Sequence, residues 1–263
     1  MTNQIVELLL QHRSIRKYQD KEVPVDIIET IVRAGQQAAF AYQAYSVLLS
    51  RNKKKHPFGA PLYFIPCVDL HKIELIMKKR EWKFRMCDIS ALLLSLQDAA
   101  YMAQNLVIAA ESYELGTCYI GSVPYHADKV AERFDLPEKI FPLVGITVGY
   151  PAENPPTRPR YPMKFTLFEN NYPKIEDKEI SKAMDVMDEG YLAQDYYKNA
   201  GYMIKLTEKD EETFDFKTYS WTEHISRKLG QWEQNSKTLL EQFRKRGFDL
   251  TEIREDLDKT HKE

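Results

Sequence analysis

The segment of residues 89–113 limits most strongly how this chain can fold. Its apolar residues recur at helical spacing and form one broad face. They are Leu92, Leu93, Leu96, Ala100, Ala103, Val107 and Ala110. Because small side chains alternate with large ones on this face, we predict a central helix that packs closely on other elements. Gly116 is expected to end it.

Four other segments have the aromatic and β-branched composition of strands. They are residues 44–50, 62–70, 117–120 and 141–150. Pro66 predicts that the second strand lies at a sheet edge or a bulge, because proline has no N–H to donate. The fourth strand is apolar enough to be covered on both faces.

Helical patterns lie between these strands without a regular alternation of strand and helix. One short helix ends near His12, Pro24 opens a second, and residues 126–134 form a third. The order is mixed α and β, without the regular βαβ alternation of a parallel sheet.

The chain changes character after Tyr150. Prolines in residues 151–162 exclude a helix or a central strand. Two charged helical patterns follow, at residues 177–199 and 221–247, joined by the acidic stretch 208–215. No separate core is evident in this part, so we expect it to pack on the first part or on a second subunit.

Composition excludes several classes of function. The 263 residues carry a net charge of −2, so no positive field attracts nucleic acid. The three cysteines lack Cys-x-x-Cys spacing, which argues against disulfides or a zinc site and favours a reducing compartment, the cytoplasm. No stretch reaches the ~20 mostly apolar residues of a membrane span, and we identify no secretion signal.

Two basic segments are candidates for binding a phosphate. The first gathers His12, Arg13, Ser14 and Arg16 just past a helix end, where each donor can give a charge-assisted hydrogen bond. Its arginines would equally complement the dipole of that helix. In the second, Pro159 fixes an extended backbone between Arg158 and Arg160. The alternative for this pair is a solvated basic linker.

Two further groups of residues have simpler explanations. Cys67, Asp69 and His71 alternate along one strand as a metal triad would, but no fourth ligand is evident, and a structural strand end is the favoured interpretation. Met184, Met187 and Tyr191 have the helical spacing of core packing. We therefore predict no metal site.

Several motifs occur in the order typical of one flavoprotein family. They are the basic segment, Gln43-Ala-Tyr-Ser46, residues 111–121, residues 148–152 and the Arg158–Arg160 pair. The sequence resembles the FMN-dependent nitroreductase family, and most closely its group A branch of NAD(P)H–flavin oxidoreductases and oxygen-insensitive nitroreductases. The resemblance runs from about residue 4 to residue 172 and reappears at residues 219–225.

The resemblance implies a fold and an assembly. The fold is an α+β three-layer sandwich whose mixed, mostly antiparallel central sheet is flanked by helices. Residues 1–172 would form the FMN-binding core. Residues 173–263 would be a helical extension of the same domain that intertwines with the partner of a homodimer, with FMN at the subunit interface.

The resemblance also implies roles for named residues. His12, Arg13 and Ser14 would contact the flavin phosphate and ribityl chain, and Arg158 and Arg160 would close on that end. Arg16 would lie by N1 and O2 of the ring, where positive charge stabilises the reduced flavin. The backbone of Ile120 and Gly121 would approach flavin N5, and Gln43 would reach the flavin of the other subunit.

Three departures from the family pattern affect this site. Relatives have a serine-rich run before the glutamine, whereas residues 36–42 here read Gln-Gln-Ala-Ala-Phe-Ala-Tyr. Residues 53–55 are lysines where another glutamine contact to the ring is usual. Residues 210–217 are rich in carboxylates where NADPH-using relatives have arginines, which favours NADH or another donor over NADPH.

The implied function is an FMN-dependent NAD(P)H oxidoreductase that works by two-step hydride transfer. NADH or NADPH would reduce the flavin, and a small electron-poor acceptor such as a nitroaromatic, a quinone or free flavin would reoxidise it. No protein acid or base is needed, because the flavin supplies the chemistry. The alternatives are a non-enzymatic flavin-binding sensor or carrier, and another flavin reaction such as reductive dehalogenation.

Overall fold

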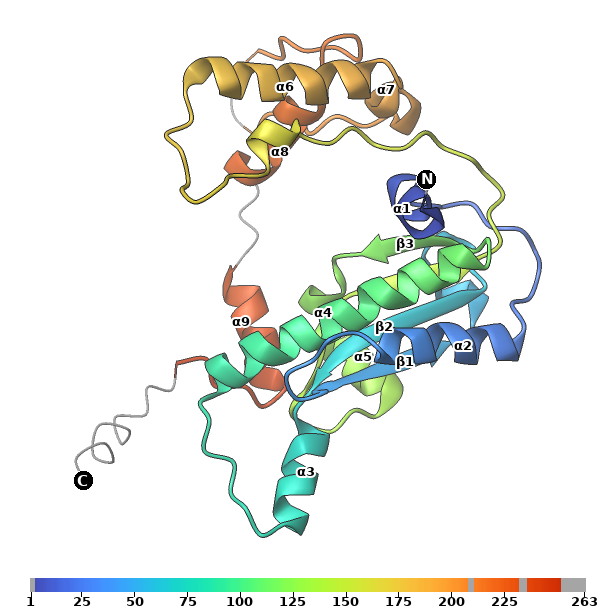
Figure 1. The fold of residues 1–263 in the computed structure, drawn as a ribbon, viewed down its shortest axis with the longest axis vertical. Helices are drawn as coiled ribbons and strands as arrows, with labels where there is room; N and C mark the ends of the chain where they lie inside the picture. The colour runs from blue at the N-terminus through green and yellow to red at the C-terminus, as the bar shows by residue number, and fades with distance from the viewer. Residues whose placement is uncertain (1–2, 208–210, 232–235, 252–263) are drawn as a thin grey trace. The chain divides into compact units, whose positions relative to one another are not determined.

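The computed structural model describes residues 3–207, 211–231 and 236–251 (Figure 1). The longer elements of its first part are α1 (Gln4–Leu10), α2 (Val25–Gln36), β1 (Tyr45–Ser50), β2 (Leu62–Asp69), α3 (His71–Lys79), α4 (Asp88–Ser112), β3 (Gly116–Ile120), α5 (Ala127–Phe134), β4 (Ile140–Pro142) and β5 (Gly145–Gly149). Four more helices follow: α6 (Asp177–Leu192), α7 (Tyr196–Ala200), α8 (Trp221–Gln231) and α9 (Ser236–Lys245).

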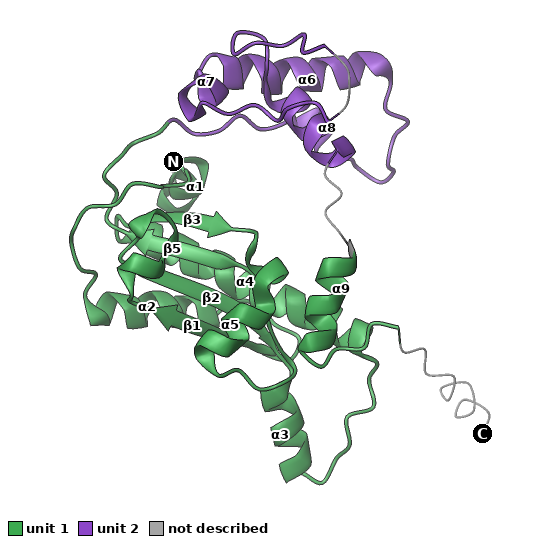
Figure 2. Cartoon of the chain, turned by 180° about the vertical axis from the view of Figure 1, so that it is seen from behind, with its two compact units in different colours: residues 1–155, 235–263 green, residues 156–234 purple. Residues whose placement is uncertain are grey.

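The chain divides into two compact units, which are described separately (Figure 2). Unit 1 comprises residues 1–155 and 235–263, and unit 2 comprises residues 156–234. The predicted division at residue 172 into a core and an extension of one domain stays a prediction. Among the described residues, no helix combines the length and the apolar character needed to cross a membrane.

Unit 1 is built on one sheet with strand order β1-β2-β5-β3, and β4 also pairs with β2. All these strand pairs are antiparallel. The residues of β2 alternate between its faces. Phe64 packs in a cluster with residues of α2 and α4, whereas Ile65 packs in a second cluster with residues of α5. Helices therefore cover both faces of the sheet, which confirms the predicted three-layer α+β fold.

Pro66 lies in the central strand β2, so the predicted sheet edge is wrong, but the predicted bulge is present. Phe64 faces Ile146 and Cys67 faces Pro142, so two residues of β2 face three residues between β4 and β5. On one side it faces Val47 of β1. On the other side its carbonyl accepts a hydrogen bond from the N–H of Leu143, between the end of β5 pairing and the start of β4 pairing. A residue's N and C=O point to the same side of a strand. The missing N–H thus falls in the gap where the predicted strand 141–150 is split into β4 and β5.

The central helix α4 follows its prediction closely, but the residue that ends it differs. Glu114 adopts a left-handed φ of 60°, and the N–H of Leu115 returns to the carbonyl of Ala110 at 3.1 Å. Gly116 begins β3 instead. A Cβ there would lie 2.6–2.8 Å from three side-chain atoms of Ile15. Glycine is required for this contact and not for ending the helix.

Unit 2 has an aromatic core of its own, contrary to the expectation that this part lacks one. Met187, Tyr191, Tyr197 and Tyr219 are buried together in it. Beside them the buried side chain of Arg227 forms ion pairs at 2.7 Å with Glu212 and Glu223. Met187 and Tyr191, predicted as core packing from their helical spacing, come from α6. Tyr197 comes from α7 and Tyr219 from an irregular segment, so no single helical period reveals the whole core.

The predicted helical pattern 221–247 belongs to both units. Its first part forms α8, and its second part forms α9, which returns to unit 1. There Phe243 stacks on Phe141 of β4 with ring centroids 3.9 Å apart, and Phe248 meets Phe141 edge-on. This aromatic contact fixes α9 to unit 1.

Candidate functional site

The basic segment of residues 12–16 lies along β3. Ser14 forms a parallel bridge with Thr117, and the N–H of Ile15 donates to the carbonyl of Thr117 at 2.8 Å. Ile15 is 3% exposed, and it packs against Gly116. Because side chains alternate along an extended segment, anchoring Ile15 in the core turns Ser14 and Arg16 the other way.

His12 is oriented by a carboxylate of α4. Its Nδ1 lies 2.7 Å from Oε1 of Glu111. The hydroxyl of Thr117 donates to the same oxygen at 2.8 Å. Glu111 therefore ties the imidazole to both α4 and β3, and the His12 side chain stays 30% exposed. Glu111 lies within the motif of residues 111–121, but its sequence position alone indicates no role for it.

Arg13 is held by oxygens at the end of α1 and in the segment that follows β5. Its Nε donates to the carbonyl of Gln11 at 3.1 Å, and its Nη1 donates to the side chain of Asn154 and to the carbonyl of Pro155. Gln11 is the C-terminal cap of α1, so Arg13 does complement the helix end. It also lines a cavity of about 470 Å³ together with Glu111 and Glu153.

Arg16 is exposed, and its backbone is held by a carboxylate that follows β5. Oε1 of Glu153 accepts hydrogen bonds from the N–H groups of Arg16 at 2.5 Å and Lys17 at 3.1 Å. The guanidinium lies 6.0 Å from the ring centroid of Phe58. Burial raises the pKa of the neighbouring Cys118 thiol, while the positive charge of Arg16 and a hydrogen bond with Ser14 lower it.

Gly121 follows the end of β3 and has open space where a side chain would lie. Ile120 is half-buried and Gly121 is exposed. A Cβ on Gly121 would meet no atom of the described residues within 4 Å, and its φ is outside the left-handed region. Neither packing within the chain nor backbone conformation therefore explains a glycine here.

Gln43 lies at the opposite edge of the sheet from these residues. It precedes β1, whereas residues 12–16 and 120–121 border β3, with β2 and β5 in between. The side chain is exposed, and the backbone has a left-handed φ of 52°. Three N–H groups around it, those of Ala41, Tyr42 and Ala44, donate to the buried carboxylate of Asp98 in α4.

Arg158 and Arg160 belong to unit 2. The guanidinium of Arg158 lies 4.2 Å from the ring centroid of Tyr196, and its Nη1 donates to Gln194 at 2.6 Å. Arg160 is exposed and donates to the carbonyls of Arg158 and Pro159. Pro159 itself packs where a Cβ on Gly190 of α6 would lie. Arg158 is thus bound to its own unit, unlike a residue of a solvated linker.

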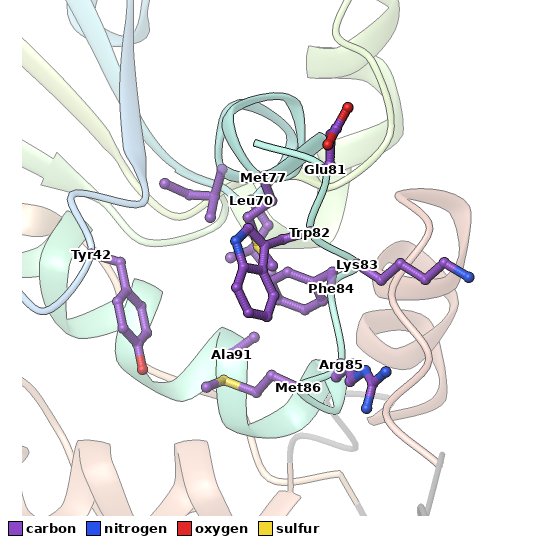
Figure 3. Close-up of a pocket in the computed structure, with 11 residues that line it drawn as sticks. Tyr42, Leu70, Met77, Glu81, Trp82, Lys83, Phe84, Arg85, Met86 and Ala91 are labelled. Carbon is purple, nitrogen blue, oxygen red and sulfur yellow. The ribbon is translucent and has the colours of Figure 1, made fainter. Parts of the chain in front are cut away.

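An apolar cavity of about 790 Å³ lies in unit 1 beside the loop of residues 38–44, called here the Gln43 loop (Figure 3). Its wall includes Tyr42 from that loop, Met77 from α3, and Trp82, Phe84 and Met86 from the segment joining α3 to α4. Figure 3 shows Trp82 and Phe84 beside the hollow, whereas Lys83 and Arg85 extend away from it. The cavity suits a flat, largely apolar molecule.

The other candidates from sequence have structural roles. Asp69 bonds the hydroxyl of Ser46 and the N–H of Lys72, Cys67 donates to the carbonyl of Ile65, and His71 begins α3. In the described parts of the chain, no three His, Cys, Asp or Glu side chains gather as metal ligands. Met187 and Tyr191 are core residues, whereas Met184 is exposed.

Three carboxylates that sequence analysis did not single out organise this site. Glu111, Glu153 and Asp98 hold His12, the Arg16 backbone and the Gln43 loop, respectively. Each partner is 50 or more positions away in the sequence, so spacing gave no signal. The one indication was that Glu111 and Glu153 lie in or next to motifs already noted.

The fold and the site define a class, an α+β protein with a basic segment and an exposed glycine along one edge of an antiparallel sheet. The nitroreductase family model matches residues 48–150. The FMN reductase (NADPH) of Bacillus subtilis (strain 168) is 31% identical over 263 residues, covering 94% of this chain and 98% of that protein. The Cr(VI) reductase of Pseudomonas sp. (strain G-1) is 31% identical over 235 residues, covering 84% and 95%.

Solved structures agree with these sequence matches. The structure of NfrA1 from B. megaterium has a TM-score of 0.78 at 28% identity, covering 94% of this chain and 99% of that chain. The chain belongs to the nitroreductase family, which confirms the family predicted from its motifs.

Proposed function

We propose that this protein is an FMN-dependent NAD(P)H oxidoreductase that reduces small electron-poor acceptors such as nitroaromatics, quinones or free flavin. The observation that carries the proposal is the edge of β3, where the donors of residues 12–16 border the start of the strand and Gly121, with open space around it, follows its end. The relatives named FMN reductase (NADPH) and Cr(VI) reductase support it.

The residues present fit the phosphate end of FMN. His12, Arg13 and Ser14 offer an imidazole, a guanidinium and a hydroxyl from one anchored segment, and such charge-assisted donors match a phosphate dianion. Arg158 and Arg160, which the family resemblance implies at the phosphate end, stay part of the proposal. The alternative role of Arg13 at the end of α1 does not exclude this, since a guanidinium has five N–H donors.

The residues at the ring end also fit. Bound FMN supplies the hydride-accepting and hydride-donating chemistry. A Cβ on Gly121 would meet no atom of the described residues, so contacts within the chain do not require a glycine here. We expect that the flavin requires it, because a side chain would keep the backbone of Ile120 and Gly121 away from the ring. Arg16 would place a fixed positive charge near the ring and favour the reduced state. No acid or base among the chain's residues is required.

We propose that the enzyme is a homodimer with FMN at the subunit interface and an intertwined extension. Gln43 and Gly121 border opposite edges of the sheet, three strand spacings or about 14 Å apart across it. A flavin on the β3 edge would then meet Gln43 of the other subunit. Ile89, Leu93 and Tyr101 of α4 are 50–59% exposed and offer an apolar surface for such a partner.

The acceptor site is proposed in the cavity beside the same loop. Tyr42 lines the cavity and is followed directly by Gln43. Aromatic and methionine side chains favour flat ring compounds, which are also the electron-poor acceptors of the proposal. NADH or NADPH would be the donor. We place the enzyme in the cytoplasm, an expectation supported by its three cysteines, which lack Cys-x-x-Cys spacing.

The absorption spectrum of the purified protein tests the proposal directly. Flavin bands should be present or appear on adding FMN, and they should bleach when NADH or NADPH is added without oxygen. Arg16→Ala should retain less flavin and lower its redox potential. A protein that does not take up FMN would refute the proposal, and an unchanged potential in Arg16→Ala would remove Arg16 from the site.

A further inference from the structure

A single buried carboxylate determines the shape of the loop before β1. Asp98 lies in α4 and is 1% exposed. Its Oδ1 accepts from the N–H of Ala41 at 2.6 Å, and its Oδ2 accepts from Tyr42 at 2.9 Å and Ala44 at 3.1 Å. Residues 38–44 form neither helix nor strand, so these bonds replace regular backbone pairing.

The three bonds bracket Gln43. They hold the residues on both sides of it, while Gln43 itself adopts the left-handed φ of 52°. A non-glycine residue keeps this conformation only when its surroundings impose it. The same loop has exposed side chains at Phe40, Tyr42 and Gln43. Asp98 therefore fixes a strained turn whose exposed side chains point outward from unit 1.

A purely stabilising role would not require this arrangement. A buried carboxylate is costly to remove from water unless hydrogen bonds replace its hydration. Here those bonds are directed at the backbone of one short irregular segment. The loop of residues 38–44 also lacks serine and threonine, so the Gln43 amide and the Tyr42 hydroxyl are the polar side-chain groups that it can offer.

We propose that Asp98 is a positioning residue for the flavin site, which acts by holding Gln43 in the conformation that contacts the flavin of the partner subunit. The inference rests on the proposed function and adds to it a residue that does not itself touch the cofactor. Charge-assisted bonds from a rigid helix keep the loop pre-formed, so FMN binding need not order it.

A double-mutant cycle on FMN affinity tests this proposal. Asp98→Asn keeps the size of the side chain but removes its charge and turns an N–H₂ group toward backbone donors. We expect FMN to bind about tenfold more weakly, the equivalent of 1.4 kcal/mol. In a Gln43→Ala background the same change should cost less than about twofold, because the residue it positions is gone. Fluorescence quenching of added FMN gives the affinities.

Ser95→Ala is the matched control. Ser95 is buried in the same helix, one turn from Asp98, and its hydroxyl donates to the carbonyl of Ala91 in that helix. It should leave FMN affinity unchanged. Amide exchange should rise in residues 41–44 of Asp98→Asn and not in Ser95→Ala. If Asp98→Asn does not fold, Asp98→Glu takes its place in the cycle. Glutamate keeps the negative charge but displaces the carboxylate.

The outcomes separate this inference from the function on which it rests. Equal losses of affinity with and without Gln43 would overturn the positioning role, as would an equal loss in Ser95→Ala. Both results leave FMN binding by the unmodified chain intact. An unmodified chain that does not bind FMN would overturn the proposed function, and this inference with it.

Discussion

Replacing Gly116 by alanine should loosen the basic segment from β3. The new Cβ would lie 2.6 Å from Cγ1, 2.7 Å from Cβ and 2.8 Å from Cγ2 of Ile15. Carbon atoms in contact prefer about 3.5–4.0 Å, so Ile15 must move by about 1 Å. It cannot do so by rotation alone, because its own Cβ is one of the atoms in conflict. The backbone of residues 14–16 therefore has to shift.

The magnitude follows from the packing. An added methyl group in a filled core typically costs about 1–3 kcal/mol. Replacing glycine within a strand returns roughly 0.5–1 kcal/mol of backbone entropy, so the net change should remain destabilising. The shift also strains the bond from Ile15 N–H to Thr117 and displaces His12, Ser14 and Arg16. We expect FMN affinity to fall about tenfold or more, since 1.4 kcal/mol is a factor of ten.

Urea unfolding of the FMN-free protein and FMN titration measure the two effects separately. Gly121→Ala is the matched control at the other end of β3, where the new Cβ meets nothing. It should leave stability within about 0.5 kcal/mol and still weaken FMN binding by obstructing the flavin. A Gly116→Ala protein with unchanged stability and affinity would show that Ile15 does not hold the segment as described.

Two further predictions concern stability. Phe248→Ala should destabilise unit 1 by about 3–5 kcal/mol in urea unfolding, because it removes a fully buried ring packed on Phe141, and FMN affinity measured under native conditions should not change. In unit 2 the hydrogen bond with Arg227 lowers the pKa of Glu212 from 4.5 to about 2. The contribution of Glu212 to the stability of unit 2 is therefore complete above pH 4.5 and is lost as the pH falls toward 2. In Glu212→Gln, stability should depend less on pH over that range. Acid unfolding followed by tryptophan fluorescence measures this.

The elements predicted well are those whose pattern is local. The apolar face of α4 and the branched residues of β1, β2 and β3 have the period of their own structure. For Pro66 the sequence could not decide between a sheet edge and a bulge, because the bulge between β4 and β5 is a tertiary feature. The core of unit 2 was missed for the same reason, since Tyr197 and Tyr219 lie outside any shared helical period.

The candidate site divides in the same way. Residues 12–16 and Gly121 were identified because contiguous motifs mark them. Their supports were not, because Glu111 contacts His12 across 99 positions and Asp98 contacts Ala41 across 57. A single sequence shows which side chains have suitable chemistry, but it does not show which carboxylate will orient them. That information is in the packing of α4 on the sheet.

The acidic stretch shows how a charge count can mislead about the electron donor. Residues 208–210 lie outside the described part. Of the carboxylates that follow, Glu212 receives two hydrogen bonds from the buried guanidinium of Arg227, and Asp215 accepts from the N–H groups of Lys217 and Thr218. Glu212 beside Arg227 repels a nearby phosphate less than a free carboxylate would, but Arg227 also pairs with Glu223 and cannot neutralise both, and the N–H partners of Asp215 carry no full charge. The repulsion that favoured NADH is therefore weaker at Glu212 than the charges of residues 210–217 alone imply. If Glu212 does repel the 2′-phosphate, Glu212→Gln should lower the KM for NADPH and leave that for NADH unchanged; if Arg227 neutralises it, the ratio of the two KM values should not fall.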